Sequence, residues 1–211
     1  MSDSKPGISW WILVALAAAI AAYAFAYVVI GGPMYPPNLK DSFVSRPWGI
    51  YSHALFGGTA MILGPFQFRR DLLRNRSRHR LLGRIYLVAC LGTGLAGFYM
   101  AFFSYGGMIT HLGFGGLALS LLGSSYLAWL VIKGRDVARH REWMIRSYAL
   151  IYAAVTLRLE IPTLMAVTQG NFDLTYHIVS WLCWVPNILV AEWYIRQSRP
   201  RATPDLPAYG A

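Results

Sequence analysis

Two copies of a histidine–glycine pattern contain the residue types best suited to cofactor chemistry in this chain. The segment His53-Ala-Leu-Phe-Gly-Gly-Thr-Ala is followed 58 residues later by His111-Leu-Gly-Phe-Gly-Gly-Leu-Ala. Further on, Arg78-His79-Arg80 is matched by Arg139-His140-Arg141. Haem iron accepts two imidazoles, and cofactor sites in helical bundles are built from side chains on facing helices. The repeat therefore predicts a haem site at His53 and His111, the outer pair. A second site at His79 and His140, the inner pair, is left open.

Two glycines follow each outer histidine by four and five residues, which places them on the same helical face. They are Gly57, Gly58, Gly115 and Gly116. The missing side chains would leave room for a flat macrocycle, and the arginines beside the inner histidines are suited to its propionates. The alternative is structural, because small residues also allow membrane helices to pack closely. The basic segments are equally suited to anionic lipids.

Two further ionisable residues interrupt apolar runs. Arg158 lies near the middle of one, where an unpaired charge is costly, so it requires a partner. Glu160 is two residues away and does not share its helical face, so a partner on another helix or a ligand carboxylate is expected. His177 begins the last apolar run and is a candidate third imidazole beside His53 and His111. Three imidazoles would instead hold zinc or copper.

The composition indicates a membrane protein. Of 211 residues, 56% are hydrophobic and 13% are charged, whereas soluble domains carry about 25% charged residues. Cys90 and Cys183 lie in apolar runs without a Cys-x-x-Cys motif, which argues against a disulfide framework or a cysteine zinc site. The chain has no hydrolase triad order, nucleotide-binding loop or His-Glu-x-x-His motif. No nucleic-acid motif accompanies the net charge of +10, so no nucleic-acid partner is expected.

Six apolar runs are each long enough to cross a bilayer as a helix. They cover approximately residues 8–30, 48–68, 81–104, 111–132, 143–167 and 176–195. The sequence therefore predicts an all-α, six-transmembrane-helix bundle that forms a single integral membrane domain over residues 1–211. The histidine repeat predicts an internal parallel two-helix repeat, in which helices 2 and 3 correspond to helices 4 and 5.

The basic residues predict the orientation of this bundle. Alternate loops and the two termini hold 16 of the 19 Lys and Arg residues. The opposite loops hold only Lys40 and Arg46, and Arg158 lies within the fifth run. This asymmetry predicts cytoplasmic N- and C-termini. Glu192, near the inner end of the sixth run, is expected to form a salt bridge with the neighbouring cations.

Several segments resemble domain of unknown function 2306, a family of predicted bacterial multi-pass membrane proteins. They are Gly64–Phe68, His79–Tyr86, His140–Met144, Arg146–Ala149, Ala154–Arg158 and Trp181–Trp184 with Asn187. The resemblance covers about residues 48–195. It implies a fold type and a location in the bacterial inner membrane, and it carries no established activity.

The arrangement is also similar to the six-helix di-haem cytochromes b, which pass electrons across membranes. In those proteins helix two pairs with helix four and helix three with helix five. The resemblance implies His53 with His111 and His79 with His140. This chain departs from that family in the shorter spacing of its histidines and in the interfacial place of the inner pair.

The resulting hypothesis is a membrane electron-transfer protein, an oxidoreductase if it is an enzyme. It would bind haem b through His53 and His111 and exchange electrons with a quinol or another small redox donor. One alternative is a non-catalytic accessory subunit of a larger membrane complex, or a scaffold that binds membrane lipids. Another is a small transporter with Arg158 and Glu160 in its path.

Overall fold

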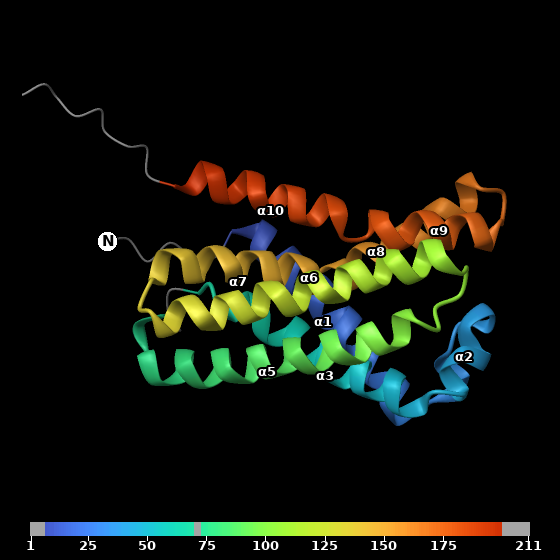
Figure 1. Cartoon of the computed structure of the whole chain (residues 1–211), viewed down its shortest axis with the longest axis horizontal. Coiled ribbons are helices and arrows are strands. Elements are labelled where there is room, and N and C mark those ends of the chain that lie inside the picture. The colour runs from blue at the N-terminus through green and yellow to red at the C-terminus, as the bar shows by residue number, and fades with distance from the viewer. Residues whose placement is uncertain (1–6, 70–72, 200–211) are drawn as a thin grey trace, which may run out of the picture.

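The computed structural model describes residues 7–69 and 73–199, and within these ranges the regular structure is entirely helical (Figure 1). The helices are α1 (Ile8–Val29), η1 (Gly32–Met34), η2 (Pro37–Leu39), α2 (Lys40–Val44), α3 (Pro47–Phe66), α5 (Arg76–Ala101), α6 (Met108–Lys133), α7 (Val137–Ile151), α8 (Ala153–Val167), α9 (Phe172–Leu182) and α10 (Val185–Ser198). The all-α class predicted from the sequence is confirmed for this part of the chain.

Side chains cap the helices that start after the polar connections. Asn75 accepts a hydrogen bond from the backbone of Arg78 before α5, at 3.1 Å, and Asp136 does so from Arg139 before α7, at 2.9 Å. Such caps satisfy backbone N–H groups that have no partner inside the helix. As a result, the Arg-His-Arg segments, which lie just before the predicted apolar runs 81–104 and 143–167, belong to the first turns of α5 and α7.

Four helices form a ring in which each packs on the next. α3 packs on α5, α5 on α6, α6 on α7, and α7 returns to contact α3. Outside this ring, α1 packs on α3 and α10 packs on α7 (Figure 1). α3 and α6 therefore face each other across one diagonal of the ring, and α5 and α7 across the other. The predicted histidine pairs lie on helices related by these diagonals.

The two ends of the bundle differ in character. At the basic end, on the left in Figure 1, α5 and α7 begin, α10 ends and α1 begins. At the opposite end, residues 31–46 connect α1 to α3 and form what we call the cap segment. Its Tyr35 and Phe43 rings pack on Tyr27 of α1, at centroid distances of 5.4 and 6.2 Å. Burial in this cluster raises the pKa of the Tyr35 phenol to about 12.

Five helical stretches among the described residues are long and apolar enough to cross a membrane. They are Ile8–Val29, Arg76–Ala101, Met108–Lys133, Val137–Val167 and Phe172–Ser198. α3 has 20 residues and no charged side chain, but it is not among them. Its glycines, prolines and His53 lower its mean hydropathy, so the expected sixth crossing is not established by length and apolarity.

Close approach of α6 and α9 gives a test of the packing. A Cβ atom added to Gly113 would lie 2.8 Å from the backbone oxygen of Ser180, which cannot move without its helix. We expect Gly113→Ala to destabilise the protein by about 2 kcal/mol, as overpacking does elsewhere. The matched control is Gly123→Ala on the same helix, because no atom lies within 4 Å of its added Cβ. Thermal unfolding in detergent would contradict this packing if both variants unfolded at the same temperature.

Candidate functional site

The two outer histidines have one ring nitrogen held by a hydrogen bond. His53 Nδ1 lies 3.2 Å from both the carbonyl oxygen and the hydroxyl of Thr93 on α5. His111 Nδ1 lies 2.8 Å from the hydroxyl of Ser104, just after α5. In each case Nε2 has no hydrogen-bond partner within the described residues. This orientation is common in metal-binding histidines, where the second nitrogen fixes the ring.

The outer histidines nevertheless lie at different heights in the bundle. A Cβ on Gly97 would be 3.1 Å from His53 Nδ1 and 3.9 Å from the Cβ of Ala118, so His53 is level with Ala118 on α6. His111 precedes Ala118 by seven residues, or about 10 Å at ~1.5 Å per residue. Two histidines on facing helices can bind one iron from opposite sides only when they are level along the bundle. The structure does not bring His53 and His111 together in this way, and they do not fit as two ligands of one haem.

The glycines of the outer motif differ in their surroundings. An added Cβ would lie 3.0 Å from the Thr93 hydroxyl at Gly57 and 2.9 Å from the Phe25 ring at Gly58. Gly57 and Gly58 therefore allow α3 to pack closely on α5 and α1. Gly115 and Gly116 are less crowded, with nearest atoms at 4.0 and 3.4 Å. Gly57 and Gly58 thus allow close helix packing, which was the structural alternative to a haem site.

The inner histidines are brought together across the other diagonal. His79 in the first turn of α5 and His140 in the first turn of α7 are both half-buried. They lie close enough for their charges to interact. His140 Nδ1 is 2.8 Å from the carbonyl oxygen of Ala128 on α6, which leaves its Nε2 without a partner. Of the two predicted pairs, the inner one is the pair whose members interact electrostatically within the described residues.

Several buried polar side-chain atoms at the basic end, including one of His79 itself, have no hydrogen-bond partner among the described residues. His79 Nδ1, both polar atoms of the Gln67 side chain and the Tyr148 hydroxyl are buried without hydrogen bonds. Gln67 Oε1 would be 3.2 Å from a Cβ on Gly83, one turn after His79 on the same face of α5. Leaving a buried polar group unpaired costs about 1–3 kcal/mol, so this region is suited to a bound polar group that would satisfy these atoms.

His177 does not join a metal site in the described structure. Its Nε2 lies 2.7 Å from the carbonyl oxygen of Gly106, in the turn between α5 and α6. No group of three His, Cys, Asp or Glu side chains within residues 7–69 and 73–199 is arranged to hold a metal ion. The alternative of a three-imidazole zinc or copper site therefore has no support from this arrangement.

Arg158 lies among aromatic side chains from other helices. Its guanidinium carbon is 5.2 Å from the ring centroid of Tyr23 on α1, and its charge interacts with Tyr27, Tyr176 and His53. Glu160 has different neighbours: one of its carboxylate oxygens is buried without a hydrogen-bond partner, and its charge interacts with Cys183, the residue after α9. Arg158 and Glu160 are not paired, as their spacing on the helix predicts.

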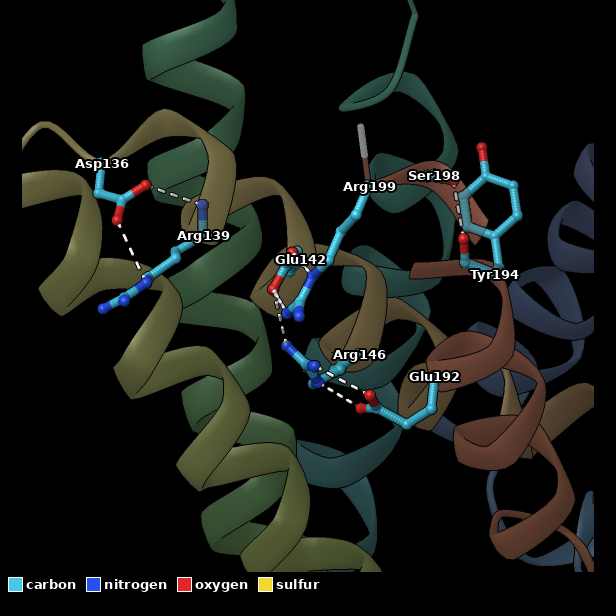
Figure 2. Close-up of polar contacts among 8 residues, drawn as sticks. All are labelled: Asp136, Arg139, Glu142, Arg146, Glu192, Tyr194, Ser198 and Arg199. Atoms are coloured by element: carbon cyan, nitrogen blue, oxygen red, sulfur yellow. Dashed lines mark hydrogen bonds and ion pairs between the residues drawn. The ribbon is translucent and has the colours of Figure 1, made fainter. Parts of the chain in front are cut away.

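An ion-pair network ties α7 to α10 at the basic end, and Figure 2 shows Arg146 between two carboxylates. Arg146 binds Glu192 of α10 with both ends of its guanidinium fork, at 2.5 and 3.0 Å. It also lies 3.9 Å from Glu142, which binds Arg199 at 2.8 Å through two hydrogen bonds. The predicted salt bridge of Glu192 with nearby cations is confirmed.

The fold and these clusters define a helical, multi-pass membrane protein with ionisable groups inside its bundle. The family model described as "Predicted membrane protein (DUF2306)" matches residues 50–195, and the chain belongs to this family. No curated protein and no solved structure matches the chain. The resemblance stated from the sequence is thus confirmed for the family.

The polar residues near the inner histidines and the tyrosines around Arg158 were not predicted from the sequence. Gln67 and Tyr148 lie in segments that carry the family resemblance, but neither was singled out as a functional candidate. The sequence feature that could have identified Gln67 and Tyr148 is a polar side chain inside an apolar run. The tyrosines around Arg158 gave less signal, because Tyr23, Tyr27 and Tyr176 come from two distant segments and tyrosine is common near membrane interfaces.

Proposed function

We propose that this protein is a membrane electron-transfer protein that binds one haem b between α5 and α7, where His79 and His140 would hold the iron. The observation that carries the proposal is the electrostatic interaction between these two histidines, whose helices lie on one diagonal of the helix ring. The ligand type fits the group, since two imidazoles are a common axial pair for haem iron in helical bundles.

Each residue near the inner pair has a defined part in this proposal. The Ala128 carbonyl, 2.8 Å from His140 Nδ1, would hold the tautomer in which Nε2 carries no proton and is available as a ligand. Arg78, Arg80 and Arg141 are exposed beside the two histidines and are suited to pair with carboxylates at the surface. When bound between two imidazoles, the haem would supply one-electron chemistry. A quinol or another small donor in the membrane is the proposed electron source.

The proposal includes six membrane crossings, with α3 as the crossing that apolarity alone does not identify. In support, α3 is enclosed by packing against α1, α5 and α7, which reduces the need for an apolar surface. The parallel two-helix repeat belongs to the same proposal. The chain would form one domain in the bacterial inner membrane, with both termini in the cytoplasm. Lys5, Arg70 and Arg201, which contribute to the charge asymmetry, lie outside the described residues.

Reporter fusions test this topology. Fusions after Arg76 and Arg141 are expected to report a cytoplasmic position, and fusions after Lys40 and Asn171 an external one. The physical reason is the positive-inside rule, applied to the cations at the basic end. A cytoplasmic signal after Lys40 would contradict the crossing by α1 and with it the orientation of the whole bundle.

Haem quantification tests the proposed cofactor. Protein purified from haem-replete cells is expected to contain equal molar amounts of haem and protein. The alternative function is a non-catalytic accessory subunit or lipid-binding scaffold, which the close packing at Gly57 and Gly58 favours. A folded preparation without haem would reject the electron-transfer proposal and leave the scaffold.

A further inference from the structure

Arg158 is a half-buried cation that has no acidic partner among the residues described by the structure. Its Nη1 donates a hydrogen bond to the carbonyl oxygen of Ala154 at 2.9 Å, while its Nε is buried and makes no hydrogen bond. The ion pairs formed within residues 7–69 and 73–199 do not include Arg158. A buried charge without compensation is strongly unfavourable, and such residues inside membranes usually serve a function.

Aromatic rings surround this guanidinium but do not neutralise it. The Tyr23 ring lies 5.2 Å away, and the Tyr27 hydroxyl donates to the Tyr23 hydroxyl at 3.2 Å. Tyr176 on α9 interacts with Arg158 electrostatically. A cation over an aromatic face gains about 0.5–2 kcal/mol, which is less than the cost of burying an unpaired charge. The cluster therefore lacks one negative charge.

The position of the cluster limits which anion can supply that charge. Arg158 precedes the end of α8 at Val167 by nine residues, or about 13 Å. Its guanidinium binds the carbonyl of Ala154, one turn further from the cap end, so the side chain does not extend toward the surface. Phe43 of the cap segment packs on Tyr27 and also on the apolar cluster that contains Tyr176. Lipid phosphates at the membrane surface are consequently too distant.

We infer that Arg158 binds the carboxylate of an apolar organic acid. The free edge of the guanidinium, formed by Nε and Nη2, presents two parallel N–H donors that match the two oxygens of a carboxylate. Nη1 is already held by Ala154, which fixes the direction of this edge. The rings of Tyr23, Tyr27 and Tyr176 would contact the apolar body of the acid. This inference is independent of haem binding, because it uses none of the residues around the inner pair.

Thermal unfolding of the full-length protein in a non-ionic detergent tests the inference with matched probes. Decanoate supplies a carboxylate on an apolar chain, decanol supplies the same chain without charge, and decyl phosphate supplies a different anion. At a concentration about 100-fold above its Kd, decanoate is expected to raise Tm by roughly 5 °C. Decanol is expected to leave Tm unchanged, and decyl phosphate to shift it less than decanoate does.

Two substitutions at Arg158 and one distant control assign the effect to this side chain. Arg158→Gln is expected to abolish the response to decanoate, because it removes the charge. Arg158→Lys keeps the charge but not the two-donor edge, so its apparent Kd for decanoate should rise about tenfold or more. Arg196→Gln, on an exposed residue near the end of α10, should respond as the wild type does.

Equal shifts by decanoate and decanol would overturn the inference, as would the absence of any shift. A full response in Arg158→Gln would overturn it as well, because the acid would then bind elsewhere. Should Arg158→Gln fail to fold, the comparison of decanoate with decanol on the wild type and on Arg158→Lys decides the matter. A shift with decyl phosphate larger than that with decanoate would contradict the carboxylate assignment.

Discussion

Replacing either His79 or His140 by alanine is expected to lower the haem content of the purified protein by more than about tenfold. Substitution of outer-shell groups alone typically costs 10–100-fold in metal affinity, and these residues are proposed as the ligands themselves. Both variants should lose the same spectral component, since both side chains are proposed to bind one iron. Haem content per protein and the visible spectrum after dithionite reduction provide the measurement.

The other three histidines act as controls for this result. His177→Ala should retain haem, because His177 is held by the Gly106 carbonyl at the opposite end of the bundle. His53→Ala and His111→Ala should also retain it, because these two residues lie at different heights. Loss of haem in both outer variants, with retention in both inner ones, would show that the outer pair binds the cofactor and would contradict our assignment.

Arg146→Met is expected to destabilise the protein by about 3 kcal/mol, the second largest effect that the structure predicts. Removal of one partner from a partly buried ion pair leaves the other charge poorly compensated. Here Glu192 would lose both hydrogen bonds to Arg146, whose side chain is only 14% exposed, and α10 would lose one of its polar contacts with α7. Chemical or thermal unfolding in detergent measures the change.

An exposed ion pair in the same helix provides the matched control. Arg139 and Asp136 are 74% and 42% exposed, so Arg139→Met should cost less than about 0.5 kcal/mol. Combining Arg146→Met with Glu192→Leu should recover much of the loss, because neither charge is then buried alone. Equal destabilisation by Arg146→Met and Arg139→Met would show that the contact of Arg146 with Glu192 contributes little to stability.

The helical class and most helix positions could be predicted because long apolar runs are strong signals. Boundaries at the basic end were missed, since the first turns of α5 and α7 are polar and their helical state depends on the Asn75 and Asp136 caps. The break at Cys183 and Trp184 between α9 and α10 was also missed. Pro186 in the first turn of α10 was its local signal, because proline removes a backbone donor.

The relative placement of the histidines could be predicted only in part. The spacing of the repeat put all four on helices of one ring, as the structure has them. It did not give their heights, because α3 begins six residues before His53 whereas α6 begins three residues before His111. The two His-x-x-Phe-Gly-Gly motifs therefore begin at different distances from the starts of their helices. The residues around Arg158 come from α1, α3 and α9, so their association depends on tertiary packing that periodicity does not encode.

The reduced-minus-oxidised absorption spectrum of the purified wild-type protein tests the central claim most directly. Protein from haem-replete cells is expected to show the sharp visible bands of a six-coordinate, low-spin b haem after reduction with dithionite. The physical reason is that two imidazoles, those of His79 and His140, would bind the haem iron. A folded protein without visible absorbance in either state would contradict the proposed function.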